Sequence, residues 1–252
     1  MSGHNKWSSI KHKKGAADAK RGAIFSRVSK EIIQAAREGG GDPNLNARLR
    51  AAIAAAKAAN MPNDNIDRAI KKGTGELQAD ILEEITYEGY VGTVGLVVQV
   101  LTSNKNRAAA EIRNIFKKNN SELGQSGSVM RNFERKGQIL LPKGDLNEDD
   151  VMMLALDAGA DDVNADDEGF EILTAPSAFA DVCDALNKAG IETTDAEVKL
   201  LPMATTPVSD LSQAKAINKF IAALEDNEDV QNVYTTADFS DEIEAALAAE
   251  EE

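Results

Sequence analysis

The segment "GQILLPKGDLNEDDVMMLALDAGADDVNADDEGFEILTAPSAFADVCDALNKAGIETTDAEVKLLP", from Gly137 to Pro202, carries the clearest fold signal in the chain. Short apolar runs bounded by Gly, Pro and Asp predict strands, and apolar residues at helical spacing predict helices between them. The predicted strands are 137–142, 161–166, 169–175 and 191–202, and the predicted helices are 147–160 and 176–190. Their order, β-α-β-β-α-β, is that of a ferredoxin-like α+β domain.

The chain on either side of this segment predicts a second α+β domain in two pieces. Strands are expected at 85–90, 94–103 and 128–135, a helix at 105–120, and a final helix and strand at 209–226 and 230–238. The final pair has no sheet of its own, so we expect it to return to the earlier strands. Residues 76–136 with 205–240 would then form one α+β domain, and 137–204 would be inserted into it. Residues 241–252 are expected to be an acidic tail, with a frayed helix as the alternative.

Residues 1–75 predict a basic helical domain, a three-helix bundle. In the first helix, Phe25, Val28, Ile32 and Ala36 recur at helical spacing, and glycines 39–41 end it.

The second and third helices of this bundle have their own start signals. Asp42 is expected to cap the second, with Pro43 in its first turn and Leu45 on its apolar face. Asp64 is expected to cap the third, and Gly73 to follow its end.

Charge is segregated along the chain, although the whole chain carries −14. Residues 1–75 hold 15 Lys+Arg against 6 Asp+Glu, a net +9, whereas residues 136–252 hold 6 against 28, a net −22. A basic segment beside an acidic body favours contact with a polyanion such as nucleic acid.

Neither export nor membrane insertion is expected. Residues 1–30 contain no apolar signal segment, and the longest apolar run, 94–100, has the length of a strand. A basic, Ser-rich start also fits a mitochondrial transit peptide, but its basic residues are mostly lysine and continue into a helical pattern. The single cysteine, Cys183, excludes an intrachain disulfide and fits a small buried side chain. We therefore expect a cytoplasmic protein.

The sequence gives no sign of an enzyme, a cofactor or a metal site. The only histidines, His4 and His12, lie among lysines that would repel a divalent cation. The "GQSGS" stretch at 124–128 has the wrong residue order for a nucleophile elbow and is interpreted as a turn into a strand. The acidic 161–169 stretch lacks calcium-loop spacing and favours a solvated turn.

The lysine-rich opening is the main candidate for nucleic-acid binding. Lys6, Lys13, Lys20 and Arg27 recur every seven residues, which would place the last three on one helical stripe, or residues 1–15 form a flexible basic arm. Trp7 either stacks on bases or packs as a hydrophobic peg, and both alternatives stay open. The full predicted set is Lys6, Trp7, Lys11, His12, Lys13, Lys14, Lys20, Arg21, Arg27, Lys30, Arg48 and Arg50.

A secondary anion site is predicted at Lys105, Asn106 and Arg107, where a helix N-terminus presents free backbone N–H groups. The alternative, which the sequence favours, is plain helix capping by Asn106 or a neighbour.

Several blocks of the chain resemble the YebC/PmpR family. They are "GHNKWSSIKHKKGAADAKRGAIFSRVSKEI" (3–32), "GGGDPNLNARLRAAIAAAKAANMPNDNIDRAIKKGTG" (39–75), "YEGY" (87–90), "SNKNRAAAEIRNIF" (103–116), "LGQSGSV" (123–129) and "EDNEDVQNVY" (225–234). The resemblance spans essentially the whole chain. It implies three domains: an N-terminal helical bundle and two ferredoxin-like α+β domains, one inserted into the other.

The resemblance also implies nucleic-acid binding without catalysis, in one of two forms. Bacterial members are described as DNA-binding transcriptional regulators. Other members, including a mitochondrial activator of translation of a cytochrome oxidase subunit, act on the ribosome, and bacterial members are said to relieve stalling at proline runs. One departure is that residues 91–94, "VGTV", replace the Gly-Pro-Gly-Gly-type loop common in the family.

Three hypotheses follow. The first is a DNA-binding regulator, the second a ribosome-associated translation factor that binds ribosomal RNA. The third is an acidic interaction scaffold whose basic domain pairs with its own acidic body.

Overall fold

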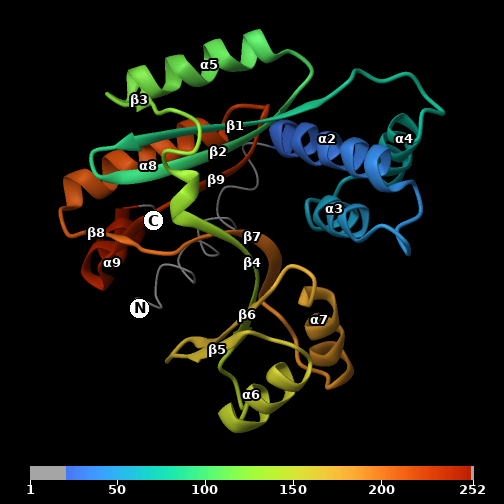
Figure 1. Ribbon diagram of the computed structural model, residues 1–252, viewed down its shortest axis with the longest axis vertical. Helices are drawn as coiled ribbons and strands as arrows, with labels where there is room; N and C mark the ends of the chain where they lie inside the picture. The colour runs from blue at the N-terminus through green and yellow to red at the C-terminus, as the bar shows by residue number, and fades with distance from the viewer. Residues whose placement is uncertain (1–20, 251–252) are drawn as a thin grey trace. The chain divides into compact units, whose positions relative to one another are not determined.

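The computed structural model describes residues 21–250 of the 252-residue chain (Figure 1). The described residues divide into two compact units, one formed by Arg131–Thr205 and the other by residues 21–130 together with 206–250. Each unit contains a four-stranded antiparallel sheet, and the larger unit also contains three N-terminal helices, so the fold is α+β. Among the described residues no helix is both long enough and apolar enough to span a bilayer.

The smaller unit has the β-α-β-β-α-β order predicted from its sequence. Its elements are β4 (Phe133–Pro142), α6 (Glu148–Asp157), β5 (Asp162–Ala165), β6 (Gly169–Thr174), α7 (Phe179–Lys188) and β7 (Asp195–Pro202). The strands lie in the order β5-β6-β4-β7, and all neighbours are antiparallel. Ile139 and Phe170 on the sheet and Val182 on α7 belong to one buried core.

Strand β4 differs from the prediction, because the separate strand expected at 128–135 does not exist. Met130–Asn132 form a short 3₁₀ helix, and one continuous strand runs from Phe133 to Pro142. Residues 133–136 pair with β7 alone, at Lys199–Pro202, which extends the strand past its other neighbour, β6. Gly137, predicted as the start of a strand, lies inside β4. A side chain at this position would collide with Phe179, so the glycine permits α7 to pack closely on the strand.

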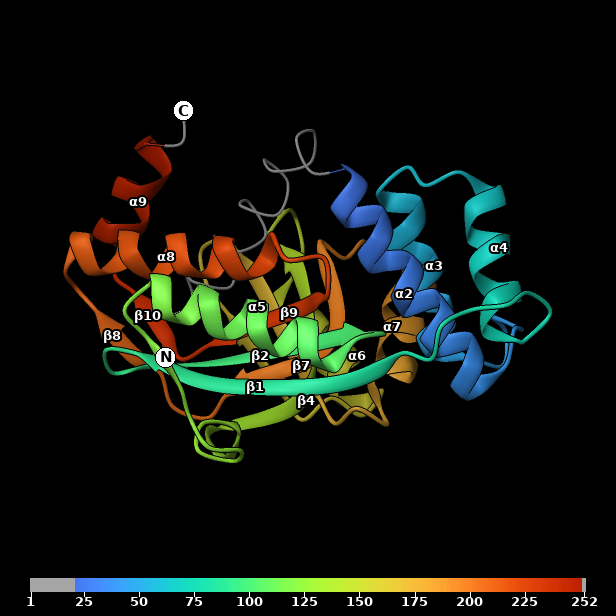
Figure 2. The same cartoon turned by 90° about the horizontal axis from the view of Figure 1, so that it is seen from above.

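The sheet of the larger unit contains β1 (Glu83–Val91), β2 (Val94–Thr102), β3 (Glu122–Leu123) and β9 (Val230–Thr235) in the order β3-β1-β2-β9. Helices α5 (Lys105–Lys118) and α8 (Leu211–Glu225) lie side by side against it, as Figure 2 shows. The rings of Phe116 and Phe220 meet edge to face, with their centroids 4.9 Å apart. The pairing of β9 with β2 confirms that the final helix and strand return to the earlier sheet. The domain boundaries at 75, 136, 204 and 240 stay predictions.

The helix that was the alternative to an acidic tail after residue 240 is present in residues 241–250. Asp241–Glu250 form α9, and its Ile243 and Leu247, one turn apart, are each 7% exposed. They pack in a small core with Ile217 of α8. Two short parallel strands, β8 (Thr206–Val208) and β10 (Ala237–Phe239), contribute to the same core. β8 was not predicted, and β10 begins within the strand predicted at 230–238.

The three N-terminal helices are α2 (Arg21–Gly39), α3 (Ala47–Ala58) and α4 (Asn63–Gly73). Their shared core includes Ile32, Leu49 and Ile66, as their spacing predicted. Gly73 is the last residue of α4 and not a residue beyond its end, as had been predicted. A glycine is needed there because the backbone of α2 leaves no room for a side chain.

Both predicted helix caps are wrong. Asn46, not Asp42, caps α3: its side-chain oxygen accepts from Leu49 N at 3.0 Å, and its amide donates to Ala35 O and Gly40 O. The helix therefore begins after Leu45. This residue was expected on the apolar face of the helix, but it is 85% exposed. Pro62 occupies the cap position of α4, and Asp64 lies in its first turn.

Candidate nucleic-acid interface

Most of the predicted binding segment lies outside the described residues. This applies to Lys6, Trp7, Lys11, His12, Lys13, Lys14 and Lys20. Arg21 is the first residue of α2. The structure therefore places Arg27, Lys30, Arg48 and Arg50 of the main set, together with the secondary site at 105–107.

Arg27 and Lys30 of α2 contact the end of α8 and the loop that joins it to β9. The Arg27 guanidinium donates to the backbone oxygen of Glu225, and Lys30 Nζ donates to that of Glu228 at 2.9 Å. Burial lowers the pKa of Arg27, against the opposing influence of the Glu225 and Asp226 carboxylates. These two cations therefore hold α2 against the body of the larger unit.

The carboxylate of Asp229 is the centre of this contact. Its side chain is fully buried and forms ion pairs with Lys30 at 2.5 Å and with Arg107 at 2.7 Å. Thr102 Oγ1 also donates to it at 3.0 Å. Burial alone would raise the pKa of Asp229, but the hydrogen bonds from Lys30 and Arg107 outweigh it and the pKa is lowered. Lys30 and Arg107, predicted in separate sites, thus share one partner.

Arg48 is the centre of a second ionic cluster. It contacts Glu31 of α2 at 2.7 Å, Glu38 at 2.6 Å, and Glu84 of β1 at 2.6 Å. The hydrogen bond to Glu31 is the main reason that the pKa of Arg48 is raised. Arg50 is exposed and donates to the backbone oxygen of Pro43 at 2.9 Å.

The secondary site is occupied by protein groups. Asn104 caps α5 by accepting from Arg107 N at 3.1 Å, which agrees with the capping interpretation. Lys105 forms an ion pair with Glu83 at 2.5 Å, and Asn106 is exposed. The hydrogen bond to Asp229 is the main cause that raises the pKa of Arg107.

The 124–128 stretch is a turn, as predicted, but it leads into the 3₁₀ helix at Met130–Asn132 and not directly into a strand. The buried carboxylate of Glu88 accepts from the backbone N–H groups of Gly127, Val129 and Met130 at 2.6 to 2.7 Å. Burial would raise the pKa of Glu88, but these three donors lower it overall. The arrangement fixes the loop on β1 and offers no activated nucleophile.

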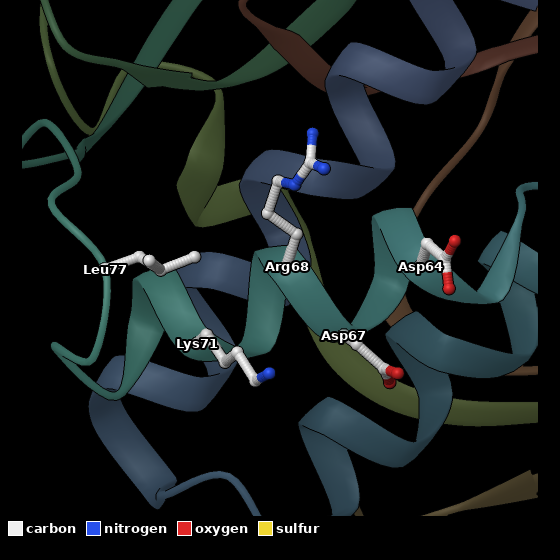
Figure 3. A pocket seen from close by; sticks show the side chains of 5 residues that line it. All are labelled: Asp64, Asp67, Arg68, Lys71 and Leu77. Atoms are coloured by element: carbon white, nitrogen blue, oxygen red, sulfur yellow. The ribbon is translucent and has the colours of Figure 1, made fainter.

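A shallow pocket of about 230 Å³ lies on α4 (Figure 3). Asp64, Asp67, Arg68, Lys71 and Leu77 line it. Its two carboxylates balance its two cations, so its charge does not favour a polyanion. The described residues contain no group of three or more potential metal-binding His, Cys, Asp or Glu side chains.

Comparison with known proteins identifies the family. Residues 5–76 match the TACO1/YebC protein N-terminal domain, and residues 82–237 match the TACO1/YebC second and third domain. The chain belongs to the TACO1/YebC family.

Relatives in this family match nearly the full length of the chain. A "Probable transcriptional regulatory protein" of Desulfatibacillum aliphaticivorans is 54% identical over 96% of this chain and 98% of its own. One of the same description from Geobacter sulfurreducens is 52% identical, with the same coverage of both chains. The crystal structure of a conserved hypothetical protein from Aquifex aeolicus is 41% identical, with a TM-score of 0.78 over 89% of this chain and 93% of that one.

Proposed function

We propose that this TACO1/YebC protein is a non-enzymatic, DNA-binding transcriptional regulator that uses its basic N-terminal arm and helical bundle. The observation that carries the proposal is the net +9 of residues 1–75 in a chain of −14, in a family whose curated relatives are named as transcriptional regulators. Binding by phosphate contacts of lysines would be largely independent of sequence.

The positions of the described cations support two separate roles, one in stabilising the helical bundle and one in binding nucleic acid. Arg27, Lys30 and Arg48 already hold backbone or carboxylate oxygens of the protein. Phosphate binding would have to break those contacts. The proposed contact to nucleic acid is therefore concentrated in Lys6, Lys11, Lys13, Lys14, Lys20 and Arg21, with Trp7 and His12 beside them, while Arg27, Lys30 and Arg48 fix the bundle that carries the arm.

The second candidate function is a ribosome-associated translation factor that binds ribosomal RNA and relieves stalled translation, for example at proline runs. The observation that favours it is Trp7 among lysines, since an aromatic interleaved with basic residues suits unpaired bases. Both forms need a cytoplasmic protein with no cofactor and no metal.

The experiment compares two variants of equal charge. Lys13→Gln/Lys14→Gln removes two positive charges from the arm, and Lys188→Gln/Lys219→Gln removes two exposed lysines from α7 and α8. Affinity for a duplex DNA and for a ribosomal-RNA fragment is measured from 0.05 to 0.3 M salt.

We expect the arm variant to lower the slope of log affinity against log salt by about 1.4 to 1.8, since each lost phosphate contact contributes about 0.7 to 0.9. The control should leave the slope unchanged. Tighter binding to the RNA fragment, with the protein in ribosomal fractions of a sucrose gradient, would favour the second function. Equal slopes for the two variants would overturn the role of the arm, and absence of binding to either probe would overturn both functions.

A further inference from the structure

The outer face of α5 is basic. Besides the paired Lys105 and Arg107, its exposed residues are Asn106, Ala110, Arg113, Asn114, Lys117 and Lys118. Glu111, the one acidic residue of the helix, has a side chain 42% exposed and faces Arg107 at 4.0 Å. The opposite face, with Ala108, Ile112 and Phe116, is buried against the sheet. Figure 1 shows α5 as an outer layer of the larger unit. In a chain with 42 acidic against 28 basic residues, an exposed face of this composition calls for an explanation.

The three cations of this face differ from those that join the helices of the larger unit to one another or to its sheet. Lys30, Arg48, Lys105 and Arg107 all form ion pairs with carboxylates. Within residues 21–250, by contrast, no carboxylate lies within 4.0 Å of the charged groups of Arg113, Lys117 or Lys118. The paired cations serve the fold, and these three do not.

Helix stability does not account for the pattern. Lys117 and Lys118 lie in the last turn, where positive charge complements the helix dipole. Arg113 lies in mid-helix, one turn before Lys117, and like charges at this spacing cost a few tenths of a kcal/mol. A Glu at either position would have removed that cost. The arrangement therefore suits a ligand that supplies the missing negative charge.

The dimensions of the face suit a phosphate backbone. From Asn106 to Lys117 the helix advances eleven residues, roughly 16 Å at 1.5 Å per residue. That length matches about five nucleotides of one strand at 3.4 Å each. Asn106 and Asn114 add neutral donors along the same row, and the small Ala110 between them leaves the row open.

We propose that the outer face of α5 is a second nucleic-acid contact, in which Arg113, Lys117 and Lys118 bind backbone phosphates. This rests on the proposed nucleic-acid binding and extends it to a surface separate in sequence from the N-terminal arm. The occupant we assign to this surface is the backbone of duplex DNA, in line with the proposed function, and an effect of the variants on the RNA probe alone would overturn that assignment.

The test uses Arg113→Gln/Lys117→Gln, with Lys188→Gln/Lys219→Gln as a control of equal charge and Arg113→Lys/Lys117→Arg as a variant that keeps the charge. Each is titrated with a duplex DNA and a duplex RNA of equal length from 0.05 to 0.3 M salt. We expect the first variant to lower the salt slope by about 1.4 to 1.8 and the affinity at 0.1 M by about 25- to 60-fold. The control and the charge-keeping variant should bind as the wild type does.

Two results would overturn the inference, and they are distinguishable. If Arg113→Gln/Lys117→Gln matches its control while Lys13→Gln/Lys14→Gln binds weakly, α5 has no role but the proposed function stands. If the wild type binds neither probe, both fall together. If the double variant unfolds early in a thermal melt, the single variant Arg113→Gln replaces it. We expect Arg113→Gln to lower the salt slope by about half as much, and an unchanged slope would contradict the proposal.

Discussion

At the scale of single residues, Asp229 holds the most consequential position. Its buried carboxylate joins Lys30 of α2 to Arg107 of α5. Breaking a buried pair by removing one partner is costly because the remaining charges lose their counter-ion. We expect Asp229→Asn to lower the free energy of unfolding by about 2–3 kcal/mol at pH 7, since Lys30 and Arg107 can partly regain water. Urea denaturation measures it, with the exposed Glu228→Gln as control, expected to cost under about 1 kcal/mol.

The same variant tests how the stabilisation by Asp229 depends on pH. The folded-state pKa of Asp229 lies below its unfolded value of about 3.9, so its stabilisation is complete above that pH and is lost as the pH falls through the folded pKa. The stability gap between wild type and Asp229→Asn should therefore stay constant from pH 7 to 5 and narrow below pH 4. A gap that widened on acidification would contradict this assignment.

Cys183 makes a second prediction at this scale. Burial, and then the neighbouring Asp184, raise the pKa of its thiol to about 11. Because the thiolate is the reactive form, alkylation by iodoacetamide should be slow at pH 8 and accelerate about tenfold per pH unit up to pH 10. In urea the rate at pH 8 should rise to that of an ordinary thiol. Mass spectrometry of the single cysteine follows both, and fast labelling of the native protein at pH 8 would refute the prediction.

At the scale of elements, apolar spacing predicted most helices and strands, and the misses have their causes in tertiary contacts. Asp42 and Asn46 are both good capping residues, and nothing in their immediate sequence separates them. The difference lies in tertiary structure, because the Asn46 amide also reaches Ala35 O and Gly40 O on the preceding helix and its loop. The isoleucine and leucine of α9 do have helical spacing, but the core they enter comes from distant segments.

The cap assignment is testable. Asn46→Ala should lower the free energy of unfolding by about 1–3 kcal/mol, because it removes the cap and the amide hydrogen bonds to Ala35 O and Gly40 O. Asp42→Ala removes only an exposed contact to Asn44 N and should cost under about 0.5 kcal/mol. Urea midpoints at pH 7 compare the two, and a larger loss for Asp42→Ala would restore the original prediction.

At the scale of the whole molecule, the sequence predicted the candidate site only as an excess of charge. The count of lysines and arginines cannot tell which cations are occupied, because Lys30 and Asp229 are 199 residues apart in sequence. The unpaired row of Arg113 and Lys117 was likewise visible in the sequence only as part of an amphipathic helix. Arg107 differs from these two residues because it pairs with the carboxylate of Asp229, which lies 122 residues later in the sequence.

Salt should therefore act differently on binding and on folding. From 0.05 to 0.3 M salt, nucleic-acid affinity should fall steeply because condensed counterions are released on binding. The urea midpoint should change little, because the Asp229 pair is buried and poorly screened. Parallel titrations and unfolding curves check this, and a midpoint that fell as steeply as the affinity would place the fold-stabilising charges at the surface.

The pairing of β2 with β9 also has a consequence for biosynthesis. Val100 meets Val230 across the sheet, so the strand partner is translated long after β2 has left the ribosome. The strands β4 to β7 emerge in between and can close their own sheet first, since their pairings lie within residues 133–202. Until β9 appears, one edge of β2 stays open, and the nascent chain carries an unfinished sheet that invites pairing with another chain.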